Sequence, residues 1–483
     1  MTDLEFQAWL EDSNAQRVTL YKLNVLSGDT PTALYLSSKP YGNGDTATPY
    51  QAIVSQNLKI VEAIAREGVR GIQFGKLGIW NVDGSRDGWL DYVFKNQKMQ
   101  AWVGDIRWSF ADFRLASSCV MEDVSGSDDP NQIMIEIRDI TQRLNTPVSD
   151  VLLPDGSLWP VTLGEACNVT LKLKDAATRE YAFHTGVSEE VLEARVEAKL
   201  RTTITKNLTV GTLTFQTSTE VGLATASVQG DKAGVIYRCT IGALVKHLVK
   251  SYGEVSARFL DGEIDIANFD AFETAHPQKV GLHLSERTNV IEACHRLASS
   301  VQAQLVPSRT GLLRLVKWGI PATAAGSILQ SHYLVDSLKP VNRYPVAAAV
   351  KIGYCRNYTP QASLQTSIPD AHKALFAAPW RFKTQFDAIT RDRYKLTTNP
   401  DLIETCLNDE VDANNEALRR LAQDKVPRTT YALEGWPVTM LLTLGQGVTL
   451  YGSRYGMVAG KLGQLTMIAF DLGTYNTELE IVI

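Results

Sequence analysis

The sequence has little excess charge of either sign, because 48 lysines and arginines stand against 53 aspartates and glutamates. A formal net charge of −5 gives no basic surface of the kind that grips the phosphates of nucleic acids. No apolar run approaches the roughly 18 residues that indicate a membrane-spanning helix. The first residues, MTDLEFQAWLEDSNAQ, carry acids early and lack the apolar core of a secretory peptide. We therefore expect a soluble chain that is made in the cytoplasm.

Cysteines are few, and they are widely spaced. The chain contains Cys119, Cys167, Cys239, Cys294, Cys355 and Cys406. No C-x-x-C pair occurs, although structural zinc and iron–sulfur sites usually contain such close pairs. We expect the six thiols to be small buried hydrophobic groups in a reducing compartment, with no metal and no other cofactor.

The patterns of common catalytic and nucleotide-binding sites are also missing. Neither G-x-G-x-x-G nor a P-loop lies between a strand and a helix, and neither G-x-S-x-G nor H-E-x-x-H occurs. The acidic stretches SGSDDPN and NVDGSRDGW lack the ligand spacing of a calcium loop, so we expect them to be solvated turns. Spacing alone does not identify the paired carboxylates of a glycosidase. The acids considered, all expected to be ordinary surface residues, are Glu165, Asp175, Glu189 and Glu190. We predict no catalytic, cofactor-binding or metal-binding residue.

Cys294 and His295 are adjacent, which invites comparison with a nucleophile and its base. On a helix, however, successive side chains point roughly 100° apart and do not face each other. Helical spacing places Cys294 on an apolar stripe with Val290, Leu297, Ala298 and Val301. The thiol then points into the core and the imidazole toward solvent or a neighbour, which excludes a catalytic pair. Asn289 is expected to cap this helix, with Glu292 completing a capping box.

What the sequence does contain is typical of a large globular protein. With 483 residues it exceeds the size of one core, and its 44% hydrophobic and 21% charged residues exclude disorder. We predict an α+β, predominantly β, multidomain fold with β-sandwich or barrel domains and a smaller helix-plus-hairpin domain. Four consecutive domains are expected: a β-rich N-terminal domain over 1–157, a second β-rich domain over 158–234, a helix-hairpin domain over 235–338, and a C-terminal β-domain over 339–483.

Alternating patterns predict the strands of the first two domains. In NQIMIEIRDI, Ile133, Ile135 and Ile137 share one face of a strand. Few helical signals occur in the first domain, so we expect it to be built of strands. In the second domain, His184 lies in an alternating run and is interpreted as a strand residue rather than a ligand.

Helix signals appear in the last two domains. Thr240 is expected to cap a helix that Gly253 ends, and 265–272 is expected to form a short helix. The segments VQAQLVP and LLRLVKW, joined by SRTG, predict a hairpin. A long helix is expected over about 400–424, with Asn399 as its cap and Pro400 in its first turn. Its expected apolar stripe is Leu402, Cys406, Val411, Leu418 and Leu421. The last fifty residues predict strands broken by glycine turns, with the C-terminal strand at the edge of its sheet.

Aromatic residues cluster in WLDYVF, from Trp89 to Phe94, and in WVGDIRWSF, from Trp102 to Phe110. Aromatic side chains of this kind stack on carbohydrate in some binding proteins. On strands they more often belong to a core or a subunit interface, which is the interpretation we favour.

Several segments resemble the tail-tip, or baseplate hub, proteins of long-tailed bacteriophages. The first has a W-P-V-x-x-G-E pattern followed by N-V, D-A-A-T and Y-x-x-H-x-G, and the second has a G-Y-x-R-N-x-x-x-Q core. The matching positions are Trp159, Pro160, Gly164, Glu165, Asn168, Val169, Asp175 to Thr178, Tyr181, His184 and Gly186 for the first, and Gly353, Tyr354, Arg356, Asn357 and Gln361 for the second. The segments VGLHLSERTNVIEACHRLASSVQAQLVPSRTGLLRL and LGQGVTLYGSRYGMVAGKLGQL are similar to further modules of the same proteins.

This resemblance implies a structural role in the virion. Family members form rings, typically threefold, whose tail-tube-like β-domains close the tail tube and line a channel for the tape-measure protein and DNA. They connect the tube to the distal tail protein and to the central or receptor-binding fibres. The resemblance therefore implies a homotrimeric, non-enzymatic hub. Two alternatives stay open: a tail-associated cell-wall hydrolase, and a carbohydrate-binding or receptor-binding tail module. Some relatives carry a cysteine-ligated iron–sulfur cluster, which the cysteine spacing here does not predict.

Overall fold

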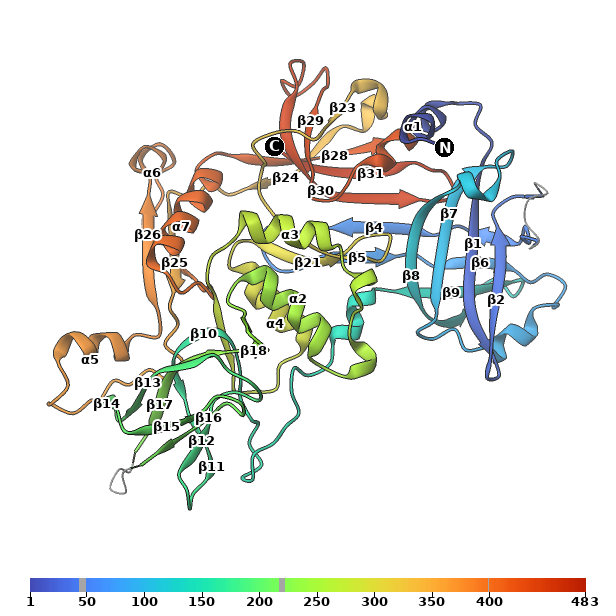
Figure 1. The fold of residues 1–483 in the computed structure, drawn as a ribbon. Coiled ribbons are helices and arrows are strands. Elements are labelled where there is room, and N and C mark those ends of the chain that lie inside the picture. Colours follow the sequence, from blue (N-terminus) through green and yellow to red (C-terminus); the bar gives the residue numbers. More distant parts are fainter. Residues whose placement is uncertain (43–48, 217–221, 398) are drawn as a thin grey trace. The chain divides into compact units, whose positions relative to one another are not determined.

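The computed structural model describes residues 1–42, 49–216, 222–397 and 399–483 (Figure 1). Two compact units are assembled from segments that alternate along the chain. The first contains residues 1–142, 306–344 and 428–483, and the second contains 143–305 and 345–427. The fold is α+β and predominantly β, as the sequence predicts. The four consecutive domain boundaries stay a prediction, because the division into units does not test where independently folding segments begin and end.

The first unit contains an antiparallel sheet whose strands differ in length. Its order is β2 (Thr30–Ser37), β1 (Arg17–Ser27), β7 (Lys98–Asp105), β8 (Arg114–Gly126), β9 (Gln132–Arg138), β6 (Leu77–Trp80) and β3 (Val54–Gln56). The alternating run predicted a strand correctly, since it forms β9 with Ile133 and Ile135 buried. The expectation of strands alone was wrong at the N-terminus. There α1 (Asp3–Glu11) begins at a capping box, in which Thr2 and Glu5 satisfy each other's backbone N–H groups.

A second sheet of this unit joins distant parts of the chain. Its order is β23 (Gly326–Ile328), β29 (Gly447–Leu450), β30 (Lys461–Asp471), β31 (Thr477–Val482), β28 (Arg428–Gly435) and β24 (Lys339–Tyr344). In addition, β4 (Lys59–Ala63) pairs with β30 and with β5 (Gly71–Phe74). The prediction that the C-terminal strand is an edge strand is wrong, because β31 pairs with β28 on one side and β30 on the other.

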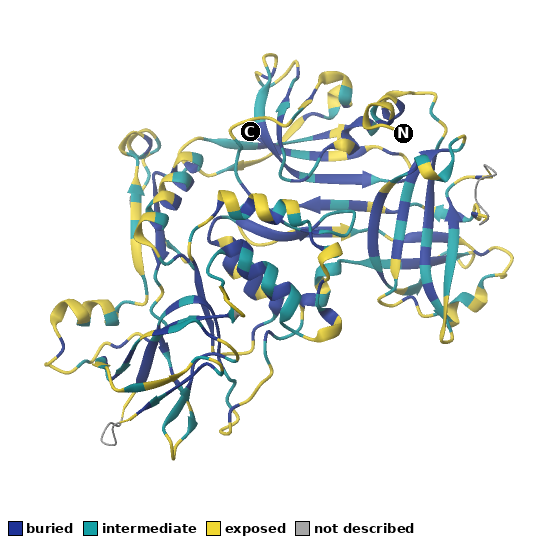
Figure 2. Cartoon of the chain, in the orientation of Figure 1, coloured by how far each residue is buried: buried dark blue, intermediate teal, exposed yellow. Residues whose placement is uncertain are grey.

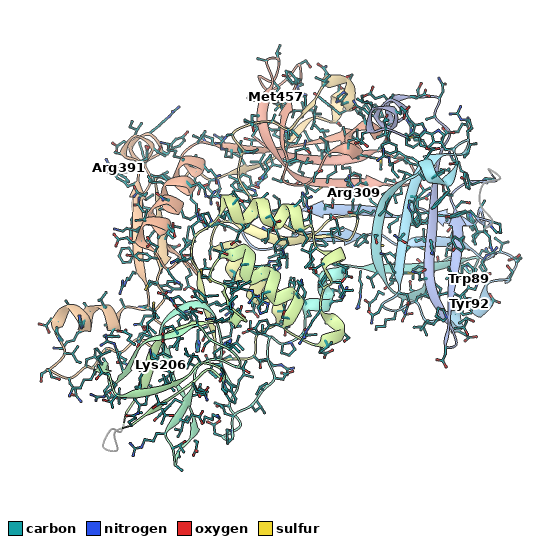
Figure 3. The ribbon with its side chains drawn as sticks, in the orientation of Figure 1. Trp89, Tyr92, Lys206, Arg309, Arg391 and Met457 are labelled. Atoms are coloured by element: carbon teal, nitrogen blue, oxygen red, sulfur yellow. The ribbon has the colours of Figure 1, made fainter. Side chains whose placement is uncertain are left out.

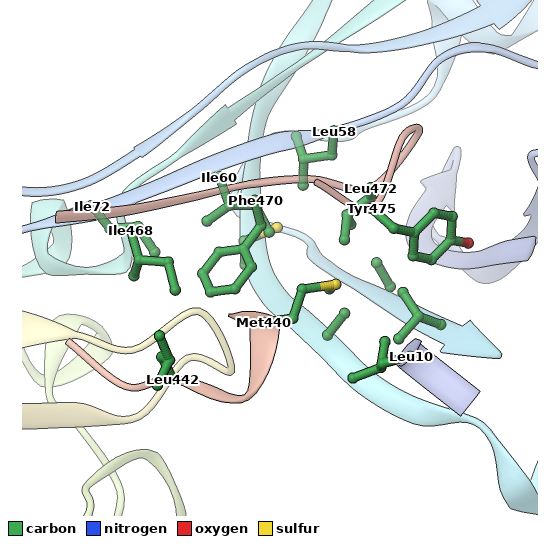
Figure 4. Packing of buried hydrophobic residues seen from close by; sticks show 14 of the residues in the cluster. Leu10, Leu58, Ile60, Ile72, Met440, Leu442, Ile468, Phe470, Leu472 and Tyr475 are labelled. Atoms are coloured by element: carbon green, nitrogen blue, oxygen red, sulfur yellow. The ribbon is translucent and has the colours of Figure 1, made fainter. Parts of the chain in front are cut away.

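Apolar side chains from strands and turns form the main core of the first unit (Figure 4). Ile60 of β4 lies beside Ile468 and Phe470 of β30, and all three are at most 1% exposed. The aromatic clusters agree only in part with the core interpretation: Phe94 is fully buried, whereas Trp89 and Tyr92 are partly buried against the main core. Trp102 and Phe110, with ring centres 5.4 Å apart, are partly buried against a smaller core cluster. Figure 2 shows the buried residues of the strands of this unit in dark blue.

A buried ion pair lies against this core. The Glu62 carboxylate accepts a hydrogen bond from the backbone N–H of Arg309 at 2.6 Å, and the Arg309 guanidinium (Figure 3) lies 3.7 Å from it. The same guanidinium donates to the carbonyl oxygens of Met440 and Leu442 and lies 4.1 Å from the Phe470 ring centre. Burial raises the pKa of Glu62 and lowers the pKa of Arg309. Each charge is therefore stable inside the unit because the other is present.

The second unit is built around the order β14 (Lys199–Arg201), β13 (Glu190–Val196), β17 (Ala224–Gly230), β10 (Val161–Thr170) and β20 (Gly281–Leu284). A smaller antiparallel sheet has the order β11 (Lys172–Asp175), β12 (Glu180–Ala182), β16 (Thr212–Phe215) and β15 (Ile204–Asn207). Residues of both sheets form one core cluster, which includes Val169, Phe183 and Leu213. β18 (Lys232–Ala233) and β19 (Ile236–Tyr237) form a short hairpin after β17.

Two helices of this unit begin at the expected cap residues, although without the expected side-chain hydrogen bonds. Thr240 and Asn289 are the N-cap residues of α2 (Ile241–Ser251) and α4 (Val290–Ser299), yet neither side chain makes a capping hydrogen bond. Glu292 pairs with Arg296 on the surface of α4 instead of completing a capping box. Gly253 follows α2 with a φ of +72°, as expected for the residue after the helix. A third helix is α3 (Ile266–Ala275), capped by Asp265.

The predicted hairpin exists as β21 (Ala303–Pro307) and β22 (Leu313–Lys317). The second unit also contains β25 (Ala349–Tyr354), β26 (Arg381–Phe386) and β27 (Leu402–Ile403), with α5 (Asp370–Ala377), α6 (Ala388–Tyr394) and α7 (Glu410–Asp424). In Figure 1, α7 lies beside β25 and β26.

The prediction of a helix over about 400–424 is wrong in its first third. α7 begins only after Asp409, whose side chain accepts a hydrogen bond from the backbone N–H of Val411. Asn399 and Pro400 precede a strand, because Leu402 and Ile403 pair in parallel with β25. The predicted apolar stripe is wrong for Val411 and Leu418, which are 64% and 47% exposed, but Leu421 is buried as predicted.

The buried face of α7 contains charged residues as well as Ala413, Ala417 and Leu421. Glu416 is 6% exposed and receives hydrogen bonds from Arg419 and from the 5%-exposed Arg420. Burial alone would raise the pKa of Glu416, but these two guanidinium groups outweigh it and lower the pKa. Arg420 also donates to the carbonyl oxygens of Ser299 and Ser300, which fixes the helix against the end of α4.

Replacing Arg309 by methionine should destabilise the first unit by roughly 3–5 kcal/mol, because the Glu62 carboxylate would stay buried without its partner. The free energy of unfolding in a urea titration measures this loss. The matched control is Arg70→Met, which removes a pair with Glu480 whose arginine side chain is 55% exposed. That change should cost less than about 1 kcal/mol. Equal losses in the two variants would contradict the assignment.

Candidate functional site

The residues of the two motifs that carry the resemblance lie in the second unit, around β10, whereas the similar segment 444–465 lies in the first unit. The segment before this strand contacts the segment after β12. Trp159 donates from Nε1 to the carbonyl oxygen of His184 at 2.8 Å, and Lys174 lies 5.3 Å from the Trp159 ring centre. Thr162 donates from its hydroxyl to the carbonyl oxygen of Phe183. The W-P-V and Y-x-x-H-x-G motifs are therefore two halves of one contact.

His184 does not lie in a strand, which corrects the sequence-based interpretation. It follows β12 and is 2% exposed. Its Nδ1 accepts a hydrogen bond from the backbone N–H of Thr162 at 3.1 Å, so the ring proton of the neutral imidazole resides on Nε2. The Thr162 hydroxyl lies 2.9 Å from Nδ1 of a second buried histidine, His283. Burial lowers the pKa of His184 to about 4 and that of His283 to about 3.

The glycine of the W-P-V-x-x-G-E motif is required by the close approach of three strands. Gly164 has a φ of +65°, and a Cβ atom there would lie 2.1 Å from the carbonyl oxygen of Val280. Its partners on the neighbouring strands are Gly230 of β17 and Gly281 of β20. A Cβ on either partner would lie 2.2 Å and 1.6 Å, respectively, from a backbone oxygen of β10. Side chains at these positions would force the strands apart.

The N-V motif contacts the G-Y-x-R-N-x-x-x-Q motif directly. A bulge in β10 places Asn168 at a φ of +50°, with its side chain 6% exposed. Its Nδ2 donates to Oδ1 of Asn357 at 2.7 Å and to the carbonyl oxygen of Thr359 at 2.9 Å. Asn357 in turn donates from Nδ2 to the carbonyl oxygens of Phe376 and Ala378. Two asparagines 189 positions apart thus hold three chain segments together.

Two cavities flank this junction within the second unit. The Arg356 cavity, of about 620 Å³, is lined by residues that include His283, Arg296, Arg356, Tyr358, Trp380 and Cys406. The Cys355 cavity, of about 460 Å³, is lined by residues that include Glu165, Cys167, Glu193, Arg195, Cys355 and Arg381. In the first, the Arg356 guanidinium lies 4.8 Å from the Tyr358 ring centre and 5.5 Å from that of Trp380.

The carboxylates of the Cys355 cavity are engaged in structural bonds. Glu193 pairs with Arg195 at 2.8 Å, and Glu165 accepts a hydrogen bond from Gln229 at 2.7 Å. The hydrogen bonds from Arg195 lower the pKa of Glu193, whereas a general acid in glycoside hydrolysis requires a raised pKa. Glu193 is therefore unsuited to that role. Two of the other acids considered form ion pairs, Glu189 with Lys232 and Glu190 with Lys206 (Figure 3). Asp175 accepts hydrogen bonds from the backbone N–H of Ala177 and the hydroxyl of Thr178.

Cys294 and His295 are separated as predicted. Cys294 is fully buried, and burial raises the pKa of its thiol, while His295 is half-buried on the other side of α4. In the described parts of the chain, no three His, Cys, Asp or Glu side chains are placed to share a metal ion. Those parts also contain no helix that combines the length and apolarity needed to span a bilayer.

One contact between two residues was not predicted from the sequence. Cys167 and Cys355 are far apart in sequence, yet their Sγ atoms lie 3.2 Å apart. Spacing along the chain gives no sign of this pair. The two cysteines are close in sequence to two asparagines that bond to each other. Cys167 immediately precedes Asn168, and Cys355 lies two positions before Asn357.

No family model matches this chain, and no curated protein matches it. Solved structures do resemble it. A tail protein from Neisseria meningitidis is 8% identical over 96% of both chains with a TM-score of 0.41. The 43 kDa tail protein of prophage MuSo2 from Shewanella oneidensis is 12% identical over 96% of this chain and 98% of its own, with a TM-score of 0.40. The prophage tail protein gp18 from Listeria monocytogenes is 9% identical over 97% and 94%, with a TM-score of 0.36. These structural neighbours are phage tail proteins. Identities and TM-scores this low give no correspondence of individual residues.

Replacing Gly164 by alanine should destabilise the second unit by roughly 3–4 kcal/mol, because it adds a backbone clash to a left-handed φ. Gly156→Ala is the matched control, since Gly156 has a φ of +82° with nothing within 4 Å of the added Cβ. That control should lose about 1 kcal/mol, the cost of the φ alone. Unfolding in urea distinguishes the two, and a Gly164→Ala variant no weaker than Gly156→Ala would refute the close approach.

Stability should fall as the pH drops from about 6.5 to about 4, because the unfolded chain then binds a proton that folded His184 excludes. The difference between the two pKa values corresponds to roughly 3 kcal/mol for this residue. His184→Gln preserves an acceptor for the Thr162 N–H but does not titrate, so its free energy of unfolding should depend less steeply on pH. His283 should leave part of the slope in place. An unchanged slope in the variant would exclude His184 as its source.

Proposed function

We propose that this chain is a structural, non-enzymatic component of a phage virion, located at the tail tip as a baseplate hub. One observation carries the proposal: the motif residues of the resemblance are those that hold the second unit together. Gly164 permits the approach of three strands, Asn168 and Asn357 join distant segments, and Trp159 and His184 close the end of β10. A motif made of packing and hydrogen-bonding residues is expected of a protein that is selected for assembly rather than catalysis.

In this role the chain forms a homotrimeric ring that closes the tail tube. It contacts the distal tail protein above and the central or receptor-binding fibres below. The ring forms a channel through which the tape-measure protein and then DNA pass during ejection. A net charge of −5 suits such a channel, because DNA would meet no basic surface to which it binds. The chain is made in the host cytoplasm and resides in the virion.

Exposed apolar side chains are available for the contacts that a ring requires. In the first unit Val82 and Leu90 are 70% and 63% exposed, and in the second Ile389 and Val411 are 80% and 64% exposed. An obligate trimer should bury well above about 2,000 Å² at its interfaces. Large apolar side chains on a surface are typical of protein–protein contacts when they lie in continuous patches.

The mass of the chain in tail tips released from particles tests the proposal. Native mass spectrometry or mass photometry should give three copies of the chain in each tip. A single copy in each assembled particle would contradict the hub.

A second measurement tests the alternative of a cell-wall hydrolase. Zymography with the purified chain on peptidoglycan should show no clearing. Clearing that is abolished by Glu165→Gln or Glu193→Gln, but retained in the paired surface control Glu190→Gln, would overturn the structural role.

A further inference from the structure

Cys167 and Cys355 are held together by a frame that does not involve their sulfur atoms. Cys167 accepts at its carbonyl oxygen from the backbone N–H of Tyr358 at 3.3 Å, and it forms a bridge with Asn357. Cys355 donates from its backbone N–H to the carbonyl oxygen of Leu407 at 2.8 Å. The Asn168–Asn357 hydrogen bond, described above, lies beside them. The fold therefore brings the two free thiols within 3.2 Å of each other.

Both thiols are accessible from the Cys355 cavity, which they line together with Arg381. The hydrogen bond between the two thiols lowers the pKa of Cys355 below the usual value of a thiol, which favours its thiolate as the attacking group. The same hydrogen bond, with burial, raises the pKa of Cys167, which holds its proton. Other cysteines differ: burial raises the pKa of Cys119 to about 12 and that of Cys406 to about 11. Thiols of that kind react slowly with oxidants.

We propose that Cys167 and Cys355 form a redox-active dithiol site that closes to a disulfide on meeting a small-molecule disulfide. The Cys355 thiolate attacks one sulfur of the reagent, a bond forms between them, the reagent's S–S bond breaks, and the released thiolate takes a proton from solvent. Cys167 then loses its proton to solvent and attacks the Cys355 sulfur, and the second reagent thiol leaves. Two protein thiols are thereby oxidised to one disulfide, and one reagent disulfide is reduced to two thiols.

A disulfide needs its sulfur atoms at about 2.05 Å, so closing the bond requires the two sulfur atoms, now 3.2 Å apart, to approach by about 1 Å. The cross-link would join β10 to the segment after β25, positions 188 apart in the sequence. A loop of this size loses much conformational freedom in the unfolded chain, so oxidation should stabilise the protein. The inference does not depend on the proposed virion role.

The test uses the full-length, reduced, folded protein and oxidised glutathione as the probe. Trypsin cleavage after Arg143, Lys172, Lys351 and Arg356 puts each cysteine of the pair on its own peptide, 144–172 and 352–356. Mass spectrometry of the native, oxidised protein should show a loss of two hydrogens and a cross-linked pair of these peptides. The oxidised protein should unfold at a temperature several degrees above that of the reduced protein.

Variants assign the order of the steps and supply the control. Cys167→Ser should stop at a mixed disulfide of Cys355 with glutathione, and Cys355→Ser should form no cross-link. Cys239→Ser, which removes a partly buried cysteine outside the pair, should form the cross-link as the unaltered protein does. Peptide mapping of the unaltered protein alone shows whether Cys167 and Cys355 form a disulfide. The test therefore does not depend on whether each variant folds. Two intact thiols at 167 and 355 after full reaction of Cys239, or separate glutathione adducts on both, would overturn the proposal.

Discussion

The hydrogen bond from Asn168 to Asn357 is the constraint on which the second unit depends. It is made possible by a bulge in β10 that turns the Asn168 amide out of the strand and into a buried position. The bond fixes the register of the 355–359 segment beside β10, and this segment separates the two cavities and places the two thiols in contact. Removing it would leave several buried amide and carbonyl groups without partners, which costs more than the bond itself contributes.

The glycines of β10, β17 and β20 act together with this constraint. Their lack of side chains lets three backbones approach more closely than any other residue would permit. The close approach buries Thr162 between two histidines that must stay neutral, so tight packing in this unit carries a sensitivity to acid. In the first unit the Glu62–Arg309 pair has a comparable position, because it is a charged group stabilised by contacts from distant segments.

Local sequence patterns predict those elements whose structure is set locally. The alternation around Ile135, the cap at Thr240 and the burial of Cys294 follow from strand and helix periodicity, and the structure agrees. The patterns fail where distant segments decide. The pattern at Leu402 and Ile403 predicts a helix, but these residues pair with β25 as a strand. The C-terminal strand was predicted to be an edge strand, but it pairs with both β28 and β30. The Cys167–Cys355 contact could not be predicted, because it depends on a bulge and a bridge 188 positions apart.

The residues of the candidate site hold distant segments of the fold together. Its motif residues form hydrogen bonds with other parts of the fold, and its carboxylate Glu193 forms an ion pair with Arg195. Residues arranged in this way maintain a shape, which is what a subunit of a large assembly contributes. In the proposed function the chain acts by its form and by its contacts with copies of itself and its neighbours.

An averaged image of the particle tip, with this chain carrying a dense label, tests that claim most directly. A homotrimeric hub at the tail tip should give three labels arranged around the axis of the tail tube at its distal end. Labels found on the fibres, at the far end of the tail, or absent from the particle would contradict it.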